Sequence, residues 1–266
     1  MMKVITFAAV KGGVGKTTMC FNLAEWLIAN NKKVLIIDSD HQGSLTHLYR
    51  AAESKDNLYD LFNYGRAKIK QVRKNLSIIP SSPNLDKLEA SLAVKSNQNF
   101  LMMMWLQDHI DQVKDYDYIL IDCHPDFMTV TKNMIAISHY VISLLEPSEF
   151  GFMNLATFES RMELFKKEAI DVRTRESYID AKTIYIPNKI KHNTSSSREL
   201  LQSLKKDKSG MVDLSLVIPQ REVFNQSTLT SKSVFDILKD KRDIKSQQLR
   251  EQLIKIFENI VKKVSE

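Results

Sequence analysis

The sequence KGGVGKTT, residues 11–18, lies between an apolar run and a helical pattern. Residues 4–10 are apolar apart from one threonine, and apolar residues at helical spacing follow through Leu27. Strand, glycine-rich loop and helix in this order are the context in which a glycine motif predicts a phosphate-binding loop. The stretch departs from the common pattern G-x-x-x-x-G-K-[ST] at its first position, where Lys11 replaces glycine.

The residue types of this loop suit a nucleoside triphosphate. Glycines without a Cβ let backbone N–H groups approach phosphate oxygens, and the following helix adds its positive N-terminal end. Lys16 is expected between the β- and γ-phosphates, and the hydroxyl of Thr17 is expected to ligate Mg²⁺. We therefore expect ATP and Mg²⁺ as cofactors, with loop contacts from Lys11, Gly12, Gly13, Val14, Gly15, Lys16, Thr17 and Thr18. A glycine-rich turn with two solvated lysines is the alternative, and it leaves the flanking strand and helix unexplained.

Acidic residues follow two apolar strand-like runs. Asp38 and Asp40 come directly after residues 34–37, and Asp122 ends the run at residues 118–122. Carboxylates spaced by two at a strand end can face the same metal ion and water. An acid that ends the strand beside a phosphate loop is typical of a magnesium-binding residue, so Asp122 is expected to hold Mg²⁺. For Asp38 and Asp40, a strand-terminating turn is the alternative.

The composition excludes several classes of protein. The 266 residues are 43% hydrophobic and 26% charged, which is ordinary for a globular chain with a sizeable core. The apolar runs are too short to span a bilayer, and no signal peptide is recognised at the N-terminus. Cys20 and Cys123 give neither a disulfide framework nor metal-ligand spacing, which favours a cytoplasmic location. The histidines other than His124 share no ligand spacing, so no zinc site is expected.

The net charge of +6 is unevenly distributed along the chain. From Lys182 onward there are 17 Lys/Arg and 10 Asp/Glu, so this part carries the whole positive excess. A basic surface attracts polyanions such as DNA or anionic lipid. A solvated face that aids solubility explains the charge equally well.

The alternation of apolar runs and helical patterns predicts an α/β fold. Runs rich in Val, Ile and Leu between helices are typical of strands buried on both faces, so we expect a doubly wound, mainly parallel sheet with helices on both faces, as in P-loop NTPases. No linker is evident, and a single domain over residues 1–266 is expected. The expected strands are residues 3–10, 33–38, 76–80, 118–122, 140–145, 183–187 and 214–219. Leu58, Leu61, Phe62 and Tyr64 are expected in a helix and in the core.

Three motifs together resemble the ParA/MinD superfamily of P-loop ATPases. The loop KGGVGKTT resembles its deviant Walker A motif, residues 38–44 (DSDHQGS) resemble its switch I, and residues 122–125 (DCHP) resemble the segment DCPP. Gln42 and Gly43 favour the ParA branch over MinD. His124 departs from the family pattern at the first proline, which leaves the local geometry of switch II open. A hydrogen-bonded histidine and one that titrates near neutral pH are both possible there.

The resemblance also implies a role for each motif residue. Lys11 corresponds to the signature lysine, which reaches the partner's ATP across a nucleotide-sandwich homodimer. Asp40 is expected to orient or activate the attacking water, so the expected catalytic residues are Lys11, Lys16 and Asp40. Asp38 is expected to support the hydrated Mg²⁺. The resemblance places Asn188 and Pro219 at the adenine base.

A partition ATPase of the small ParA type is therefore the expected function, since the phosphate loop begins near residue 11 without an N-terminal helix-turn-helix. The resemblance implies that the ATP-bound dimer binds nonspecific DNA on the nucleoid and that a ParB-like centromere-binding protein stimulates slow hydrolysis. The candidate DNA contacts are Lys189, Lys191, Arg198, Lys205, Lys206, Arg221, Lys232, Lys241, Arg242 and Lys245.

A MinD-like, membrane-cycling positioning ATPase is the main alternative, because the last helical pattern is amphipathic with lysines on its polar face. Packing of that helix on the core is the simpler interpretation, so stable membrane association is not expected. A reductase iron protein is a weak third alternative, because the two cysteines lack cluster spacing.

Overall fold

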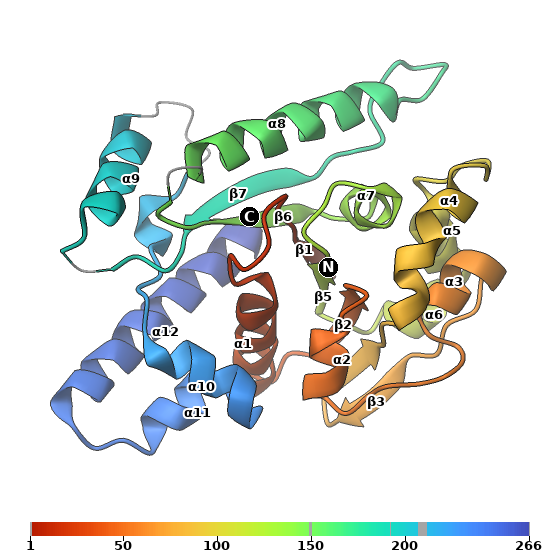
Figure 1. The fold of residues 1–266 in the computed structure, drawn as a ribbon. Helices are drawn as coiled ribbons and strands as arrows, with labels where there is room; N and C mark the ends of the chain where they lie inside the picture. Colours follow the sequence, from red (N-terminus) through yellow and green to blue (C-terminus); the bar gives the residue numbers. More distant parts are fainter. Residues whose placement is uncertain (1, 149–150, 192, 207–211, 266) are drawn as a thin grey trace.

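A seven-stranded sheet in the order β3-β4-β2-β5-β1-β6-β7 forms the centre of the computed structural model (Figure 1). The structure describes residues 2–148, 151–191, 193–206 and 212–265. Strand β3 pairs antiparallel with β4, and the other pairings in the sheet are parallel. The strands are β1 (Lys3–Phe7), β2 (Val34–Ser39), β3 (Lys70–Arg73), β4 (Leu76–Ile79), β5 (Tyr118–Cys123), β6 (Tyr140–Leu145) and β7 (Lys182–Pro187).

Helices connect the strands and cover both faces of the sheet (Figure 1). The α-helices are α1 (Lys16–Ala29), α2 (Ser44–Leu48), α3 (Leu58–Tyr64), α4 (Leu88–Leu92), α5 (Leu101–Asp108), α6 (Ile110–Val113), α7 (Thr129–Ala136), α8 (Gly151–Glu168), α9 (Ser195–Lys206), α10 (Glu222–Thr230), α11 (Val234–Lys239) and α12 (Ile244–Ser265). Two 3₁₀ turns are η1 (Pro83–Lys87) and η2 (Leu214–Leu216).

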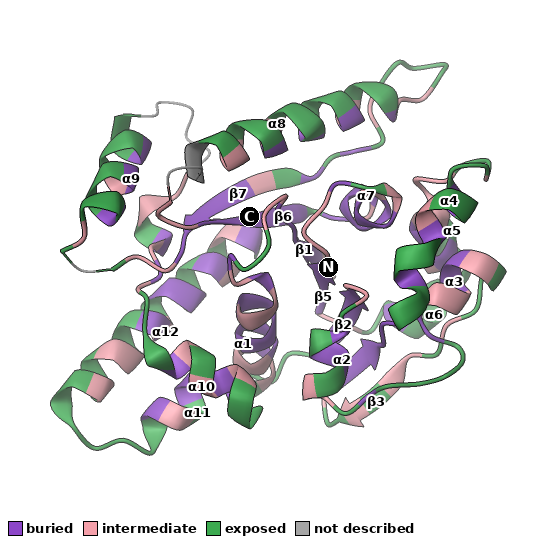
Figure 2. Cartoon of the chain, in the orientation of Figure 1, coloured by how far each residue is buried: buried purple, intermediate pink, exposed green. Residues whose placement is uncertain are grey.

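Side chains of the central strands alternate between two hydrophobic cores. Val34 and Ile36 of β2 join the core formed with α1, α11 and α12, whereas Leu35 and Ile37 join the core formed with α3, α5, α7 and α8. Figure 2 shows the central strands of the sheet buried, and the edge strand β3 and the outer helix faces more exposed. Since every residue of β2 is buried, the strand needs an apolar side chain on both faces, which explains its continuous apolar sequence. The expected doubly wound, mainly parallel fold is confirmed.

Helix α12 packs its apolar face against the first of these cores. Leu253, Ile256, Phe257, Ile260 and Val264 are buried there, at the spacing of one helical stripe. The expectation that this helix packs on the body of the protein is therefore confirmed. Within the part of the chain that the structure describes, no helix is both long enough and apolar enough to cross a membrane.

The expected strand at residues 214–219 is wrong. Asp213 accepts a hydrogen bond from the backbone N–H of Ser215 and so caps the 3₁₀ turn η2. Val212 and Pro219 form only isolated bridges, to Tyr185 and Ile190 respectively. A local side-chain cap therefore replaces the strand pairing that the apolar residues suggested.

Other differences lie at the edges of the fold. The first strand ends at Phe7, because the chain then turns into the glycine loop. Strand β3 was not expected, since its alternation of half-buried and exposed polar residues is a weak signal. Tyr64 was expected in the core, but it lies at the end of α3 and is exposed.

Candidate nucleotide-binding site

The glycine loop joins β1 to α1 at the carboxyl edge of the sheet (Figure 1). Gly13 and Gly15 adopt positive φ angles of 76° and 98°, a conformation that side chains with a Cβ rarely adopt. Gly15 is the N-cap of α1, so the helix begins at Lys16, whose side chain is largely buried. The loop therefore has the shape of an anion-binding turn at a helix N-terminus.

The end of β7 is tied to this loop by Asn188. Its Nδ2 donates a hydrogen bond to the carbonyl oxygen of Val14 at 2.8 Å. A Cβ on Gly15 would lie 2.7 Å from the same nitrogen, so only glycine fits this position. The amide of Asn188 carries both a donor and an acceptor, which suits recognition of a base edge.

A cavity of about 370 Å³ opens beside the helix that follows the loop. Its lining includes Gly15, Thr18, Asn188, Pro219 and Phe224. This volume lies in the range of small-molecule sites. The cavity brings together four of the predicted nucleotide contacts, Gly15, Thr18, Asn188 and Pro219.

Asp38 and Asp122 are register partners on the adjacent strands β2 and β5. Both carboxyl groups are fully buried. Burial raises the pKa of Asp38 to about 6 and, together with the nearby Asp38, raises the pKa of Asp122 well above its usual value. Lys16 and the hydroxyl of Thr17 lower the pKa of Asp122, but they do not offset the burial.

The two carboxyl groups differ in their hydrogen bonding. Oδ2 of Asp38 accepts bonds from the backbone N–H and the hydroxyl of Thr46, at 2.7 and 2.8 Å. Among the described residues, neither oxygen of Asp122 has a hydrogen-bond partner, and the nearby Thr17 does not complete one. An unpaired buried carboxyl group is costly, whereas carboxylate and hydroxyl oxygens are good ligands for Mg²⁺. The residues at Asp122 and Thr17 therefore fit a magnesium ion.

Ser81 and Thr46 hold the segment after β2 in place. The hydroxyl of Thr46 accepts a bond from the backbone N–H of Ser81 while it donates to Asp38. The Ser81 hydroxyl donates to the carbonyl oxygen of Asp40 at 2.5 Å. The loop after β4 thus positions both Asp38 and Asp40.

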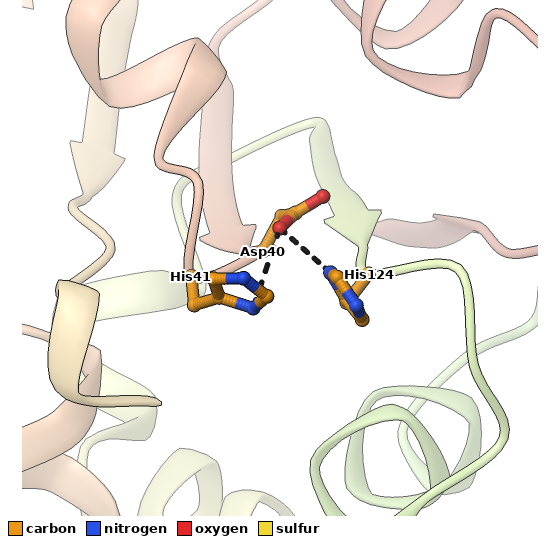
Figure 3. A group of neighbouring side chains, drawn as sticks. All are labelled: Asp40, His41 and His124. Atoms are coloured by element: carbon orange, nitrogen blue, oxygen red, sulfur yellow. Dashed lines mark hydrogen bonds and ion pairs between the residues drawn. The ribbon is translucent and has the colours of Figure 1, made fainter. Parts of the chain in front are cut away.

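Asp40 lies between two histidine rings at the ends of β2 and β5 (Figure 3). Its Oδ1 is 2.9 Å from Nδ1 of His124 and 3.9 Å from Nδ1 of His41. His124 is therefore a hydrogen-bonded residue of the site. The two rings have their centroids 4.3 Å apart. The sequence analysis found no ligand spacing among the histidines other than His124 and did not place His41 beside it, because this contact arises only when β2 and β5 pair.

Lys11 does not point freely into solvent. Its ammonium is paired with Glu146 at the end of β6, and it lies 3.4 Å from the Ser148 hydroxyl. The other oxygen of Glu146 lies 3.6 Å from the ammonium of Lys189, which also donates to the carbonyl of Gly13. Lys189, one of the predicted DNA contacts, is thus engaged with the glycine loop and Glu146, and its contact with DNA stays a prediction.

A buried amide connects α1 to the C-terminal helices. Asn22 exchanges hydrogen bonds with the hydroxyl of Ser227 on α10 and accepts one from the backbone N–H of Val234 on α11. Ser233 caps α11 through the N–H of Asp236. The helix that begins at the phosphate loop is thus fixed to the basic C-terminal part of the chain.

The structure brings the predicted residues to one edge of the sheet. Asp38 and Asp122 lie at the carboxyl ends of β2 and β5, and the glycine loop, Asp40 and Asn188 come after β1, β2 and β7. Sequence reasoning did not single out Thr46 or assign a role to Glu146. Thr46 lies on a short helix with no recognisable motif. Residues 146–151 resemble a family loop at the dimer face, with an ordinary strand-to-helix loop as the alternative, but this pattern did not predict the pairing of Glu146 with Lys11; residues 149 and 150 lie outside the described residues. Ser81 lies in the PSS segment after β4, where a strand-end location was the available signal.

The fold and the loop define a P-loop nucleotide-binding protein. A protein-family model described as AAA domain, AAA_31, matches residues 2–174. The chain is 34% identical over 161 residues to the chromosome-partitioning ATPase Soj of Treponema pallidum, covering 58% of this chain and 61% of Soj. It is 27% identical over 227 residues to the virulence plasmid ParA family protein pGP5-D of Chlamydia psittaci, covering 76% of this chain and 85% of that protein.

Solved structures share the fold over nearly the whole chain. A plasmid partition protein from Borrelia burgdorferi has a TM-score of 0.72 at 23% identity, with 98% of each chain covered. A Cyanothece McdA–ATP complex has a TM-score of 0.80 at 20% identity, covering 99% of this chain and 96% of McdA. Cobyrinic acid a,c-diamide synthase from Mycobacterium smegmatis, with a bound ATP analogue and magnesium, has a TM-score of 0.67 at 22% identity, covering 84% and 88%.

These matches show that the chain belongs to the AAA-domain family of P-loop proteins, and within it to the ParA family of P-loop ATPases. The chain spans about three fifths of the length of the relatives Soj and the Pseudomonas putida protein that it matches.

Proposed function

We propose that this protein is a ParA-type ATPase that drives the partition of a plasmid, a chromosome or another large cargo. The observation that carries the proposal is the convergence of the phosphate loop, the buried Asp122 and the cavity beside Asn188 at one sheet edge. Phosphate, cation and base positions are then all provided by strand ends, as expected for a nucleotide site in a doubly wound fold.

ATP and Mg²⁺ are the proposed ligands of this site. Two structures with the same fold bind ATP or an ATP analogue, one of them with magnesium. In this chain Asp122 and Thr17 would hold the ion, and Asp38, positioned by Thr46, would support its hydration shell. The ion would supply charge neutralisation at the phosphates. Lys16 would bind the β- and γ-phosphates, and Asn188 and Pro219 would contact the base.

Hydrolysis would depend on Asp40, Lys16 and Lys11. Asp40 is held by Ser81 and His124 at the edge of the site, where its carboxylate would orient the attacking water. Lys16 would bind charge that develops on the transferred phosphoryl group. Lys11 would leave Glu146 and reach the ATP of a second subunit, so that a sandwich homodimer forms only with nucleotide.

The ATP-bound dimer would bind DNA without reading sequence. Nine of the ten candidate basic residues are exposed, and they lie between the end of β7 and the start of α12; they are Lys191, Arg198, Lys205, Lys206, Arg221, Lys232, Lys241, Arg242 and Lys245. Contacts of lysine and arginine with phosphates are independent of sequence and sensitive to salt. A ParB-like protein would stimulate slow hydrolysis and release the dimer from the nucleoid in the cytoplasm.

An ATP-dependent mobility shift on nonspecific duplex DNA tests this proposal. The wild-type protein should retard DNA with ATP and Mg²⁺ but not with ADP, and Lys16→Ala should not retard it under either condition. Binding should weaken steeply with salt, because counterions are released from several phosphates. An unchanged DNA mobility with ATP, or a flat salt response, would contradict the proposal.

Lipid vesicles serve as the parallel test of the MinD-like alternative. Since the apolar face of α12 is buried in the core, the protein should stay in the supernatant when vesicles of anionic lipid are sedimented with ATP. ATP-dependent sedimentation that is lost without residues 249–266 would favour membrane cycling instead.

A further inference from the structure

We propose that Asp40, His41 and His124 form a binding site for a divalent transition-metal ion of the zinc class (Figure 3). One ligand atom of each residue lies within 4.8 Å of the other two. Asp40 and His41 follow β2, and His124 follows β5, so the pairing of these strands brings the three side chains together. This site is separate from the magnesium position at Asp122 and Thr17.

The distances suit a small ion after modest side-chain rotation. Oδ1 of Asp40 is 2.9 Å from Nδ1 of His124 and 3.9 Å from Nδ1 of His41. Ligand atoms around a tetrahedral zinc ion, bound at about 2.0–2.1 Å, lie roughly 3.3 Å apart. The two observed distances lie on either side of that value. The His41 ring is partly exposed, so a change in its χ angles would bring its nitrogen into range.

The donor set selects the class of metal. Imidazole nitrogen is a good ligand for zinc, copper and nickel, whereas Mg²⁺ and Ca²⁺ prefer oxygen ligands. The side chains of Asp40, His41 and His124 are 13%, 28% and 33% exposed, so a fourth position is open to water. Three protein ligands with one open position are typical of zinc sites that keep an exchangeable ligand.

Metal binding would act on the segments that follow β2 and β5 at the same time. The ion would occupy the carboxylate of Asp40 and join the segment after β2 to the segment after β5. Asp40 would then be withdrawn from the attacking water, so hydrolysis would stop while the nucleotide stays bound. This consequence rests on the proposed function, whereas binding of the ion does not.

Zinc titration of the nucleotide-free protein tests the site, because nucleotides themselves bind zinc. Competition with a chromophoric chelator should give one tight site per chain. His41→Gln and His124→Gln should each weaken binding at least about tenfold, since loss of a ligand exceeds the effect of losing an outer-shell partner. His109→Gln, in which the histidine stacks on Trp105 in α5, is the matched control and should bind as the wild type does.

Cobalt provides a second measurement that reports on the ligands. The Co²⁺-loaded wild type should show visible d–d bands of a tetrahedral site, and both histidine variants should lose them. A large excess of Mg²⁺ should displace neither ion. Equal zinc affinity in the wild type and the two variants, or cobalt bands that survive both substitutions, would overturn the inference.

The zinc site and the proposed ATPase function can be refuted separately. Absence of tight zinc binding with intact ATP turnover would remove this site and leave the proposed function. Zinc binding that depends on both histidines in a protein without ATP turnover would support the site while removing the proposed function.

Discussion

The ammonium of Lys11 is paired with the carboxylate of Glu146 in the same subunit. In the proposed dimer this lysine reaches the neighbouring nucleotide, so the ion pair must break first. Lys11 is 34% exposed in its side chain, and pairs of this kind contribute about 0–1 kcal/mol. Glu146 therefore competes only weakly with the partner's ATP for the ammonium group of Lys11.

Lys11→Ala should leave ATP binding by the monomer intact and prevent ATP-driven dimerisation. Light scattering with a nonhydrolysable ATP analogue measures the dimer, and a fluorescent nucleotide measures binding. A normal nucleotide-driven dimer in this variant would refute the trans role of Lys11.

Glu146→Gln should favour the dimer, because Lys11 is then released without loss of an ion pair. Dimerisation with a nonhydrolysable analogue is expected to tighten by up to about fivefold, measured by sedimentation. Glu53→Gln, which removes the ion pair with Lys70 outside the site, is the control and should have no effect. A weaker dimer in Glu146→Gln would mean that Glu146 itself makes contacts across the interface.

Asp40→Ala should trap the ATP-bound dimer on DNA. The loss of the residue that orients water is expected to lower turnover at least about 100-fold, while nucleotide and DNA binding persist. Steady-state ATPase measurements and a DNA mobility shift give the two readouts. Ordinary turnover would contradict the assignment of Asp40.

Asp122→Asn should stabilise the nucleotide-free protein and abolish binding of Mg²⁺ with ATP. The substitution removes an acid whose negative charge is disfavoured by burial and by the neighbouring Asp38, so the free energy of unfolding is expected to rise by roughly 1–3 kcal/mol. Urea unfolding measures the stability. Asp115→Asn replaces an exposed aspartate and should change the stability by less than about 0.5 kcal/mol. A destabilised Asp122→Asn protein would show that the carboxyl group has a structural partner.

Glu25 gives the protein a pH-dependent stability outside the nucleotide site. Burial raises the pKa of this carboxyl group above its usual 4.5, although Arg73 and the Tyr49 hydroxyl act against it. Because the pKa of Glu25 is raised in the folded state, the folded protein holds this proton more tightly than the unfolded chain does. The contribution of Glu25 to the free energy of unfolding is therefore greatest below pH 4.5 and is lost as the pH rises through the folded pKa.

Glu25→Gln should remove that part of the pH dependence while keeping the hydrogen bond from Tyr49. Urea unfolding at pH 4.5 and near neutral pH measures it, with Arg73→Ala as the control for the lost ion pair. An unchanged difference between the two pH values in Glu25→Gln would contradict the assignment.

The buried strands could be predicted because a strand covered on both faces must be apolar throughout, as in β2 and β5. The phosphate loop could be predicted because its glycines and lysines have no common structural alternative between a strand and a helix. The turn η2 could not be predicted, because Asp213 forms a local cap next to a mainly apolar segment that resembles a strand. The single domain stays a prediction.

Contacts between strand ends depend on the strand order, which the sequence does not state. His41 and His124 are far apart along the chain and meet only because β2 and β5 are neighbours in register. The roles of Thr46 and Ser81 likewise depend on the loops that follow β2 and β4. Motifs therefore predicted which residues reach the site, but not how these residues hold one another.

The buried amide of Asn22 has a mechanical consequence. It bonds α1 to both α10 and α11, so these three helices are expected to tilt together. If nucleotide binding tilts α1, the position and orientation of Lys232, just before α11, would change without any contact between ATP and that lysine. The presence or absence of the γ-phosphate would then affect a distant basic residue through the hydrogen bonds of one side chain, Asn22.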